Sequence, residues 1–246
     1  MKSEDRVEFI IEWIKNYCKL IKFQPVSLVV GVSGGIDSAV TSTLCAKTGL
    51  KTIAVSMPIK QNKDQHNLSI DHLNWLKKNF DNVITKVINL DETFNIFFNT
   101  IKEFNSELAF ANSRSRLRMI TLYQVAQSSN GLVVGTGNKV EDFGVGFYTK
   151  YGDGGVDISP IADCTKTQVW EIGKTLSIIE NIINAKPTDG LWDDSRNDEK
   201  QLGLSYKQIE DAMINPLSEN YNKYLEIRKK NLHKMKPIPV CKFKES

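Results

Sequence analysis

A short apolar run followed at once by a glycine-rich turn and a helical pattern is the feature that most limits how this chain can fold. Residues 27–32 read SLVVGV, residues 31–38 read GVSGGIDS, and helical sequence then continues to Lys47. An apolar run rich in β-branched residues is typical of a strand buried on both faces of a parallel sheet. Small residues between a strand and a helix let backbone N–H groups converge on an anion. The sequence therefore predicts an α/β fold with a phosphate-binding loop.

The same alternation of strands and helices continues along the N-terminal half. An amphipathic helix precedes the first strand, and Pro25 ends it. Further strands are expected at residues 52–57, 83–88 and 132–135. Helices are expected at residues 38–47, 67–80, 91–104, 106–127, 166–176, 206–213 and 219–234. Strands that alternate with helices predict βαβ units and a parallel sheet covered on both faces.

Composition excludes several classes of protein. Of the 246 residues, 41% are hydrophobic and 25% charged, which is typical of a globular chain. The net charge of +3 is too small to suggest nucleic-acid binding, and no apolar run approaches the roughly 18 residues of a membrane span. The first ten residues show no secretory pattern, and the four cysteines are far apart. We expect a cytoplasmic protein with free thiols and no membrane association.

The residues of the glycine-rich turn indicate which anion it binds. The turn lacks the lysine of G-x-x-x-x-G-K-[ST], and its glycine spacing differs from the dinucleotide motif G-x-G-x-x-G. Asp37 stands in the turn where a cation would be expected. A carboxylate beside a phosphate is repulsive unless a metal links them, and Mg²⁺ commonly does so. We therefore predict that Asp37 binds Mg²⁺ beside a phosphate.

Six segments together carry a resemblance to a known family. They are GVSGGIDS at 31–38, NSRSRLRM at 112–119, GTGNKVE at 135–141, GFYTKYGDGGVD at 146–157, PTDGLW at 187–192 and His233-Lys234. The first resembles the signature of the ATP pyrophosphatases, and the set resembles the ammonia-dependent NAD⁺ synthetases nearly end to end. The resemblance implies a Rossmann-like three-layer α/β sandwich with a central parallel sheet and a helical C-terminal tail. It implies one domain over residues 1–246, with a lid at about 187–203 and C-terminal helices at about 205–236.

The family's reaction is the ATP-dependent amidation of deamido-NAD⁺ by ammonia. An adenylated intermediate forms, and the products are NAD⁺, AMP and pyrophosphate. The resemblance also implies Mg²⁺ as cofactor and a homodimer. Free ammonia is the expected donor, because the ligase elements use the chain and leave no room for a glutaminase domain of about 100 or more residues. Two alternatives stay open: another ligase with this signature, such as a GMP synthetase subunit, and a non-catalytic adenine-nucleotide-binding protein.

The resemblance assigns the ATP site and the metal site residue by residue. Asp37 and Glu141 are the expected metal ligands, and Asp37, Lys166 and Asp157 are the expected catalytic residues. The expected ATP-binding residues are Gly31, Val32, Ser33, Gly34, Gly35, Ile36, Asp37, Ser38, Thr136, Lys166 and Thr188. A lysine in the first turn of a helix is unfavourable with the helix dipole, which independently favours a phosphate partner for Lys166.

The remaining expectations concern the acceptor, the lid and the surface. The expected deamido-NAD⁺ contacts are Arg116, Lys150, Asp157, His233 and Lys234. The lid acids Asp193, Asp194 and Asp198 are expected to be solvated, although one of them could help deprotonate ammonium. His66 and His72 are six residues apart, which is not a usual ligand spacing, so both are predicted on the surface. Residues 94–110 have more apolar side chains than one helix face needs, and the surplus is predicted to be buried in a two-fold dimer.

Overall fold

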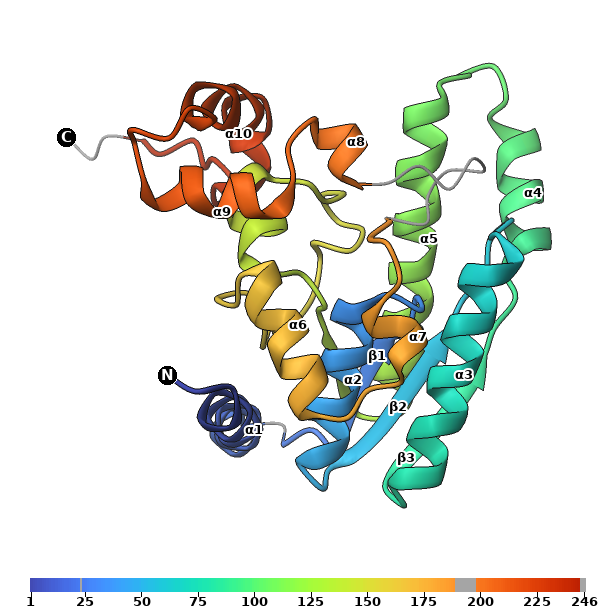
Figure 1. The fold of residues 1–246 in the computed structure, drawn as a ribbon. Coiled ribbons are helices and arrows are strands. Elements are labelled where there is room, and N and C mark those ends of the chain that lie inside the picture. The colour runs from blue at the N-terminus through green and yellow to red at the C-terminus, as the bar shows by residue number, and fades with distance from the viewer. Residues whose placement is uncertain (23, 189–197, 244–246) are drawn as a thin grey trace.

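A four-stranded parallel sheet lies at the centre of the computed structural model, which describes residues 1–22, 24–188 and 198–243 (Figure 1). Its strand order is β3-β2-β1-β4, and every neighbouring pair is parallel. The strands are β1 (Ser27–Gly31), β2 (Lys51–Ser56), β3 (Val83–Val87) and β4 (Gly131–Val134). All four lie within a residue or two of the strands expected from the sequence, so that prediction is confirmed.

Helices separate the strands and form the C-terminal tail. They are α1 (Ser3–Leu20), α2 (Ile36–Lys47), α3 (Lys63–Asn79), α4 (Asp91–Thr100), α5 (Glu107–Ser128), the π-helix η1 (Lys139–Val145), α6 (Lys166–Thr175), α7 (Glu180–Ile183), α8 (Asp198–Leu202), α9 (Tyr206–Ile214) and α10 (Tyr221–Met235). The π-helix was not expected, because the glycine-rich sequence around it shows no helical period. None of the described helices has the length and apolar content needed to span a bilayer.

Successive residues of the strands bury opposite faces of the sheet. Val30 of β1 and Ala54 of β2 are paired in register and face α2 and α3. Val29 and Ile53, one residue earlier in each strand, are also paired and pack with α4 and α5. A strand covered on both faces needs apolar residues at every position, which explains the continuous apolar runs in the sequence.

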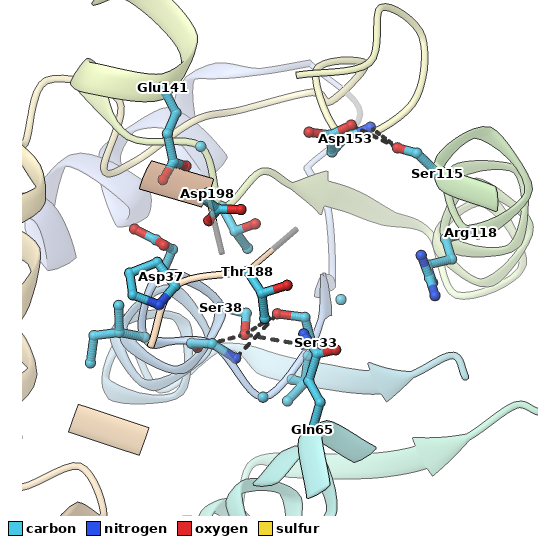
Figure 2. A pocket seen from close by; sticks show the side chains of 18 of the residues that line it. Ser33, Asp37, Ser38, Gln65, Ser115, Arg118, Glu141, Asp153, Thr188 and Asp198 are labelled. Atoms are coloured by element: carbon cyan, nitrogen blue, oxygen red, sulfur yellow. Dashed lines mark hydrogen bonds between the residues drawn. The ribbon is translucent and has the colours of Figure 1, made fainter. Parts of the chain in front are cut away.

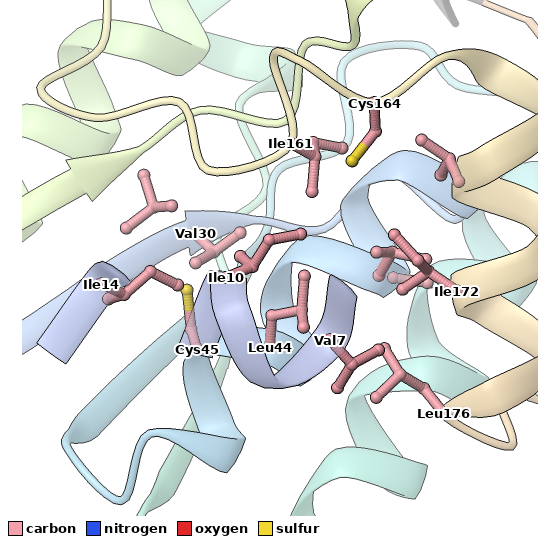
Figure 3. Close-up of a cluster of buried hydrophobic side chains, with 14 of the residues drawn as sticks. Val7, Ile10, Ile14, Val30, Leu44, Cys45, Ile161, Cys164, Ile172 and Leu176 are labelled. Carbon is pink, nitrogen blue, oxygen red and sulfur yellow. The ribbon is translucent and has the colours of Figure 1, made fainter. Parts of the chain in front are cut away.

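The larger core fills the face on which α1, α2 and α6 lie (Figure 3). Ile14 of α1, Leu44 of α2 and Ile172 of α6 are fully buried there. Cys18 and Cys45 are in this core as well, and the buried cysteines are free thiols, as predicted. The N-terminal helix therefore belongs to the α/β domain and packs directly against α2 and α6.

The strand order reverses between β1 and β4, and this reversal fixes where a ligand can bind. The connections after β1 and β2 place α2 and α3 on one face, whereas α4 and α5 lie on the other before the chain enters β4. At such a switch point the two following loops diverge and leave a crevice at the carboxyl ends of the strands. The loops that diverge here are residues 31–35 and 135–138.

The C-terminal tail packs around η1 and has a core of its own. Val140, Val145, Tyr206 and Ile209 are buried in it. The α10 residue Asn231 donates a side-chain hydrogen bond to the Val145 carbonyl oxygen at 2.9 Å. These contacts hold the end of η1 against α10, so the tail packs directly on the element that follows β4 rather than forming a separate appendage.

Candidate active site

Hydrogen bonds between nearby residues give the loop after β1 its shape. The Ser38 hydroxyl accepts a bond from the Ser33 backbone N–H at 3.1 Å and donates to the Gly35 carbonyl oxygen at 2.9 Å. Gly34 has a φ of +90°, and a Cβ atom there would lie 2.6 Å from the Gln65 carbonyl oxygen of α3. Both the backbone angle and the close approach of α3 therefore require glycine at this position.

The loop delivers the N-terminus of α2 to the crevice with its donors available. Gly35 is the N-cap, and no described side chain caps it. The first-turn N–H groups of a helix have no intrahelical acceptor, and the helix dipole favours an anion beside them. Residues 31–38, the predicted phosphate loop, all line a cavity of about 490 Å³.

Asp37, Glu141 and Lys166 meet at the edge of this cavity. The Lys166 ammonium lies 2.5 Å from Asp37 Oδ2 and 2.9 Å from Glu141 Oε1. Lys166 begins α6 and is 2% exposed, so it is not a surface lysine. The cluster joins three elements, α2, η1 and α6, and Asp37 and Glu141 lie on the same side of the cavity in Figure 2.

Two further side chains hold the carboxylates in place. Asn138 is fully buried and donates from Nδ2 to Asp37 Oδ1 at 3.1 Å. Its Oδ1 accepts from the backbone N–H groups of Val140 and Glu141, so the same residue caps η1. The Tyr206 hydroxyl donates to Glu141 Oε1 at 2.6 Å. Asn138 thus links Asp37 of α2 to the first turn of η1, which contains Glu141.

Burial and the Lys166 charge compete to set the protonation of this cluster. Burial raises the pKa of Asp37, although the ammonium partly offsets that effect. Burial also opposes ionisation of Glu141, but Lys166, Tyr206 and Asn138 outweigh it, so the pKa of Glu141 is lowered. Burial alone would lower the pKa of Lys166, yet the two carboxylates raise it above its ordinary value. Lys166 is therefore a cation at neutral pH.

The position of the Lys166 ammonium shows that this site accommodates a cation between two carboxylates. No group of three or more histidine, cysteine, aspartate or glutamate side chains with metal-site geometry occurs among the described residues. Two carboxylates suit Mg²⁺, which usually keeps several waters and takes its other ligands from substrate phosphates. Asp37 and Glu141 therefore fit the ion expected from the sequence.

Other cavity residues include both expected and unexpected ones. Thr136 and Thr188, the expected ATP contacts outside the loop, line the cavity. On the opposite side, Asp153 accepts a 2.6 Å hydrogen bond from the Ser115 hydroxyl, and Arg118 donates from Nε to the Met57 carbonyl oxygen at 2.9 Å (Figure 2). Arg118, rather than Arg116, is the arginine of the 112–119 segment that borders the cavity.

The expected acceptor residues gather around the 146–157 loop, outside the cavity lining. The exposed Arg116 donates from Nε to the Lys150 carbonyl oxygen at 3.2 Å, and Lys234 donates from Nζ to the Tyr148 carbonyl oxygen at 2.8 Å. His233 is exposed beside Lys234. Asp157 accepts from the Val133 backbone N–H at 2.8 Å and the Tyr123 hydroxyl at 3.1 Å. Its carboxylate therefore ties this loop to β4.

Only part of the expected lid can be compared with the structure. Residues 189–197, which include Trp192, Asp193 and Asp194, lie outside the described residues. Asp198 was expected to be solvated, but it is 5% exposed and borders the cavity, so that expectation was wrong. The Tyr206 hydroxyl, 3.3 Å from Asp198 Oδ2, and the packing of α8 against the tail explain its burial.

Sequence reasoning missed Asn138, Tyr206 and Arg118. Asn138 had a usable signal, because an asparagine that directly follows a strand-end Gly-Thr-Gly is a good helix N-cap candidate. No sequence signal pointed to Tyr206, since a lone aromatic residue at the start of a helix usually belongs to the core. Arg118 could not be separated from Arg114 and Arg116 until the rotation of α5 was known.

Comparison with known proteins gives matches over nearly the whole chain. A family model described as NAD synthase matches residues 6–245. An NH(3)-dependent NAD(+) synthetase from Carboxydothermus hydrogenoformans is 38% identical over 219 residues, covering 86% of this chain and 85% of that protein. An NH(3)-dependent NAD(+) synthetase from Mesoplasma florum is 35% identical over 241 residues, covering 96% of this chain and 93% of that protein.

Solved structures with the same fold include two with informative descriptions. A structure described as NMN synthetase from Francisella tularensis has a TM-score of 0.89 at 29% identity, covering 99% of this chain and 100% of that one. An NH3-dependent NAD synthetase from Campylobacter jejuni, in complex with nitrate, has a TM-score of 0.78 at 25% identity, with coverage of 98% and 100%. The three-layer α/β fold is thereby confirmed.

Proposed function

The chain belongs to the NAD synthase family and is an ammonia-dependent ligase that forms a C–N bond, and we propose that it amidates the nicotinate carboxyl of deamido-NAD⁺. In the proposed reaction a nicotinate carboxylate oxygen attacks the α-phosphorus of ATP, and pyrophosphate leaves. Ammonia then attacks the carbonyl carbon of the adenylate, and AMP leaves as the amide forms. The attacking nitrogen loses a proton in this step.

One observation carries the proposal: the phosphate loop, residues 31–38, borders the same cavity as Asp37, Glu141 and Lys166, which we call the cation cluster. The uncapped first turn of α2 supplies N–H donors for phosphate oxygens, and Asp37 projects from that same turn. Glu141 and Lys166 meet Asp37 there from two other elements. Backbone N–H donors, paired carboxylates and a lysine ammonium are the groups needed to bind and polarise a triphosphate.

Each residue of the cluster has a role in this scheme. Asp37 and Glu141 would hold Mg²⁺, which when bound neutralises negative charge on the triphosphate. Lys166 would leave the carboxylates and donate to a phosphate oxygen, an exchange within reach of its long side chain. Asn138 keeps Asp37 and η1 in register throughout. No side chain forms a covalent intermediate, so the chain works by positioning and charge neutralisation.

The residues around the 146–157 loop are the proposed acceptor site. Arg116, Lys150, His233 and Lys234 offer cationic or hydrogen-bonding groups suited to a nucleotide phosphate. Asp157 is proposed to contact the nicotinate nucleotide through the loop that it anchors. All five lie on this loop or on α5 and α10 beside it.

A second acceptor, nicotinate mononucleotide, is favoured by one comparison. The Francisella tularensis structure described as NMN synthetase matches 99% of this chain with a TM-score of 0.89. Nicotinate mononucleotide has the same carboxyl group, ribose and phosphate as deamido-NAD⁺ and lacks only the adenylate half. The two acceptors would use the same adenylation chemistry and differ in how far the acceptor site extends.

Competing-substrate kinetics test the proposal. Purified protein with ATP, Mg²⁺ and ammonium is given deamido-NAD⁺ and nicotinate mononucleotide separately and then together, and both amides are quantified by chromatography. We expect a higher kcat/KM for deamido-NAD⁺; a preference for the mononucleotide would move the assignment to the second acceptor. No amide from either one would refute the proposal. Glutamine freed of ammonium should give no product, and sustained turnover with it would refute the ammonia assignment.

We also propose that the chain is a two-fold homodimer. Ile96 of α4, Phe104, and Leu108 and Ile120 of α5 are 63%, 71%, 60% and 67% exposed. Exposed large apolar side chains on two helices that contact each other favour a protein interface. Sedimentation should give a dimer at micromolar concentration, and Leu108→Glu with Ile120→Glu should shift it to monomer. A monomeric wild-type protein with full activity would contradict this proposal.

A further inference from the structure

Tyr206 contacts two of the three charged groups of the cation cluster, Glu141 and Lys166. It is 2% exposed, and its hydroxyl donates to Glu141 Oε1 at 2.6 Å. The Lys166 ammonium lies over its ring, 4.8 Å from the centroid. A hydroxyl directed at a carboxylate and a ring face directed at an ammonium are the favourable orientations for each charge. Tyr206 therefore complements the two opposite charges with two different parts of its side chain.

The position of Tyr206 is itself fixed by its surroundings. Ser205 and Gln208 form a capping box that sets the first turn of α9, where Tyr206 is the first residue. The Tyr206 backbone N–H donates to Glu199 Oε1 of α8 at 2.9 Å. Trp170 of α6 packs edge-on against its ring, with centroids 6.1 Å apart. The hydroxyl consequently has little freedom to move away from Glu141.

We propose that Tyr206 is a positioning residue that orients the Glu141 carboxylate for the metal–ATP complex. Glu141 has two strong partners in this structure, Lys166 and Tyr206. If Lys166 moves to a phosphate oxygen, as the proposed function requires, Tyr206 becomes the partner that keeps Glu141 in place. Residues that hydrogen-bond a metal ligand in this way commonly change metal affinity about tenfold or more when they are lost. The inference rests on the proposed metal role of Glu141 and extends it to the C-terminal tail.

The chain offers a matched control for this hydroxyl. Tyr224 of α10 is 7% exposed and lies in the same hydrophobic cluster as Tyr206. Its ring contacts Tyr221, with centroids 6.3 Å apart, and its hydroxyl makes no hydrogen bond to Glu141 in the described part of the chain. Tyr206→Phe and Tyr224→Phe thus remove the same atom from the same core, but only the first removes a bond to the carboxylate.

Mn²⁺ binding measured by electron paramagnetic resonance tests the role without any acceptor substrate. Mn²⁺ is titrated into each variant in the presence of saturating α,β-methylene-ATP. We expect Tyr206→Phe to weaken Mn²⁺ binding about tenfold and Tyr224→Phe to stay within about twofold of wild type. Equal affinity in Tyr206→Phe and wild type, while Glu141→Gln weakens binding, would overturn the proposal.

A double-mutant cycle separates positioning from a general effect on folding. In the Glu141→Gln background, Tyr206→Phe should cost little further Mn²⁺ affinity, because the carboxylate it orients is gone. Fully additive losses would indicate a structural effect and overturn the proposal, even if Tyr206→Phe is less stable than wild type. The assay contains only Mn²⁺ and the ATP analogue. Failure to amidate deamido-NAD⁺ would therefore refute the proposed reaction, whereas the Mn²⁺ affinities would still decide whether Tyr206 orients Glu141.

Discussion

The phosphate loop and the cation cluster border one cavity but are built in different ways. Ser33, Gly35 and Ser38 bond to one another within six residues of sequence, and the loop continues directly into α2. In the cluster, Lys166 reaches Asp37 across 129 residues of sequence and Glu141 across 25. The hydrogen bonds of the loop therefore lie within one short segment, whereas the cluster exists only when η1 and α6 have packed against α2.

Asp37 belongs to both regions, so its replacement should have the largest effect. We expect Asp37→Asn to lower adenylation at least about a thousandfold, equivalent to about 4 kcal/mol, because an anionic metal ligand is lost. The loop should keep its shape, since its hydrogen bonds do not use the Asp37 side chain. Pyrophosphate release with deamido-NAD⁺ in a single turnover measures the loss.

The thermal midpoint of Asp37→Asn is the control. Lys166 keeps Glu141 as its partner in this variant, so the midpoint should stay close to that of wild type. A near-wild-type rate of pyrophosphate release would show that the metal role of Asp37 is wrong.

Lys166 belongs only to the cluster, and Lys166→Met should give the next largest effect. We expect adenylation to fall about a hundredfold to a thousandfold, as for other preorganised groups that stabilise a transition state. Nucleotide-free Mn²⁺ should bind this variant more tightly than wild type, because the ammonium no longer competes for Asp37 and Glu141. The comparison uses the same Mn²⁺ titration without nucleotide.

Lys166→Arg is the control variant. Removing the buried cation in Lys166→Met leaves two carboxylates unpaired and can destabilise the fold, whereas Lys166→Arg keeps the positive charge. It should bind nucleotide-free Mn²⁺ as weakly as wild type does. Equal Mn²⁺ affinity in wild type and Lys166→Met would show that the lysine does not occupy the cation position.

His72 lies against α2, the helix that follows the phosphate loop, and its protonation is expected to change the stability of the fold rather than the activity. It is fully buried between α3 and α2, with Nε2 2.9 Å from the Ser42 hydroxyl, so the predicted surface position was wrong. Burial lowers the pKa of His72 from 6.5 to about 4. Between these values the unfolded chain binds the proton and the folded chain does not, so acid lowers the free energy of unfolding.

The free energy of unfolding is expected to fall by about 2 kcal/mol between pH 6 and pH 4.5, since each pH unit contributes about 1.4 kcal/mol. Urea denaturation at several pH values measures it. His72→Gln should flatten this part of the profile, and His66→Gln on the same helix controls for the loss of a histidine. Identical profiles for wild type and His72→Gln would contradict the burial argument.

Local pattern in the sequence determined the sheet and the phosphate loop. The runs at β1, β2 and β4 are apolar because both faces of those strands are covered, and that requirement is visible residue by residue. Gly34 and Asp37 were identified because loop geometry and charge conflict act over a few residues. The resemblance to the ammonia-dependent NAD⁺ synthetases added Glu141 and Lys166, which spacing alone did not select.

Tertiary structure decided which side chains complete the site. Tyr206 reaches Glu141, and Asp198 reaches Tyr206, only because α8 and α9 pack against α6 and η1. Nothing within the segments of Tyr206 and Asp198 specifies those partners. His72 is buried, and Arg118 borders the cavity, because of how α3 and α5 are rotated against the sheet. Sequence periodicity gives the face of a helix that is apolar, but the neighbour of each polar side chain depends on contacts between segments far apart in the chain.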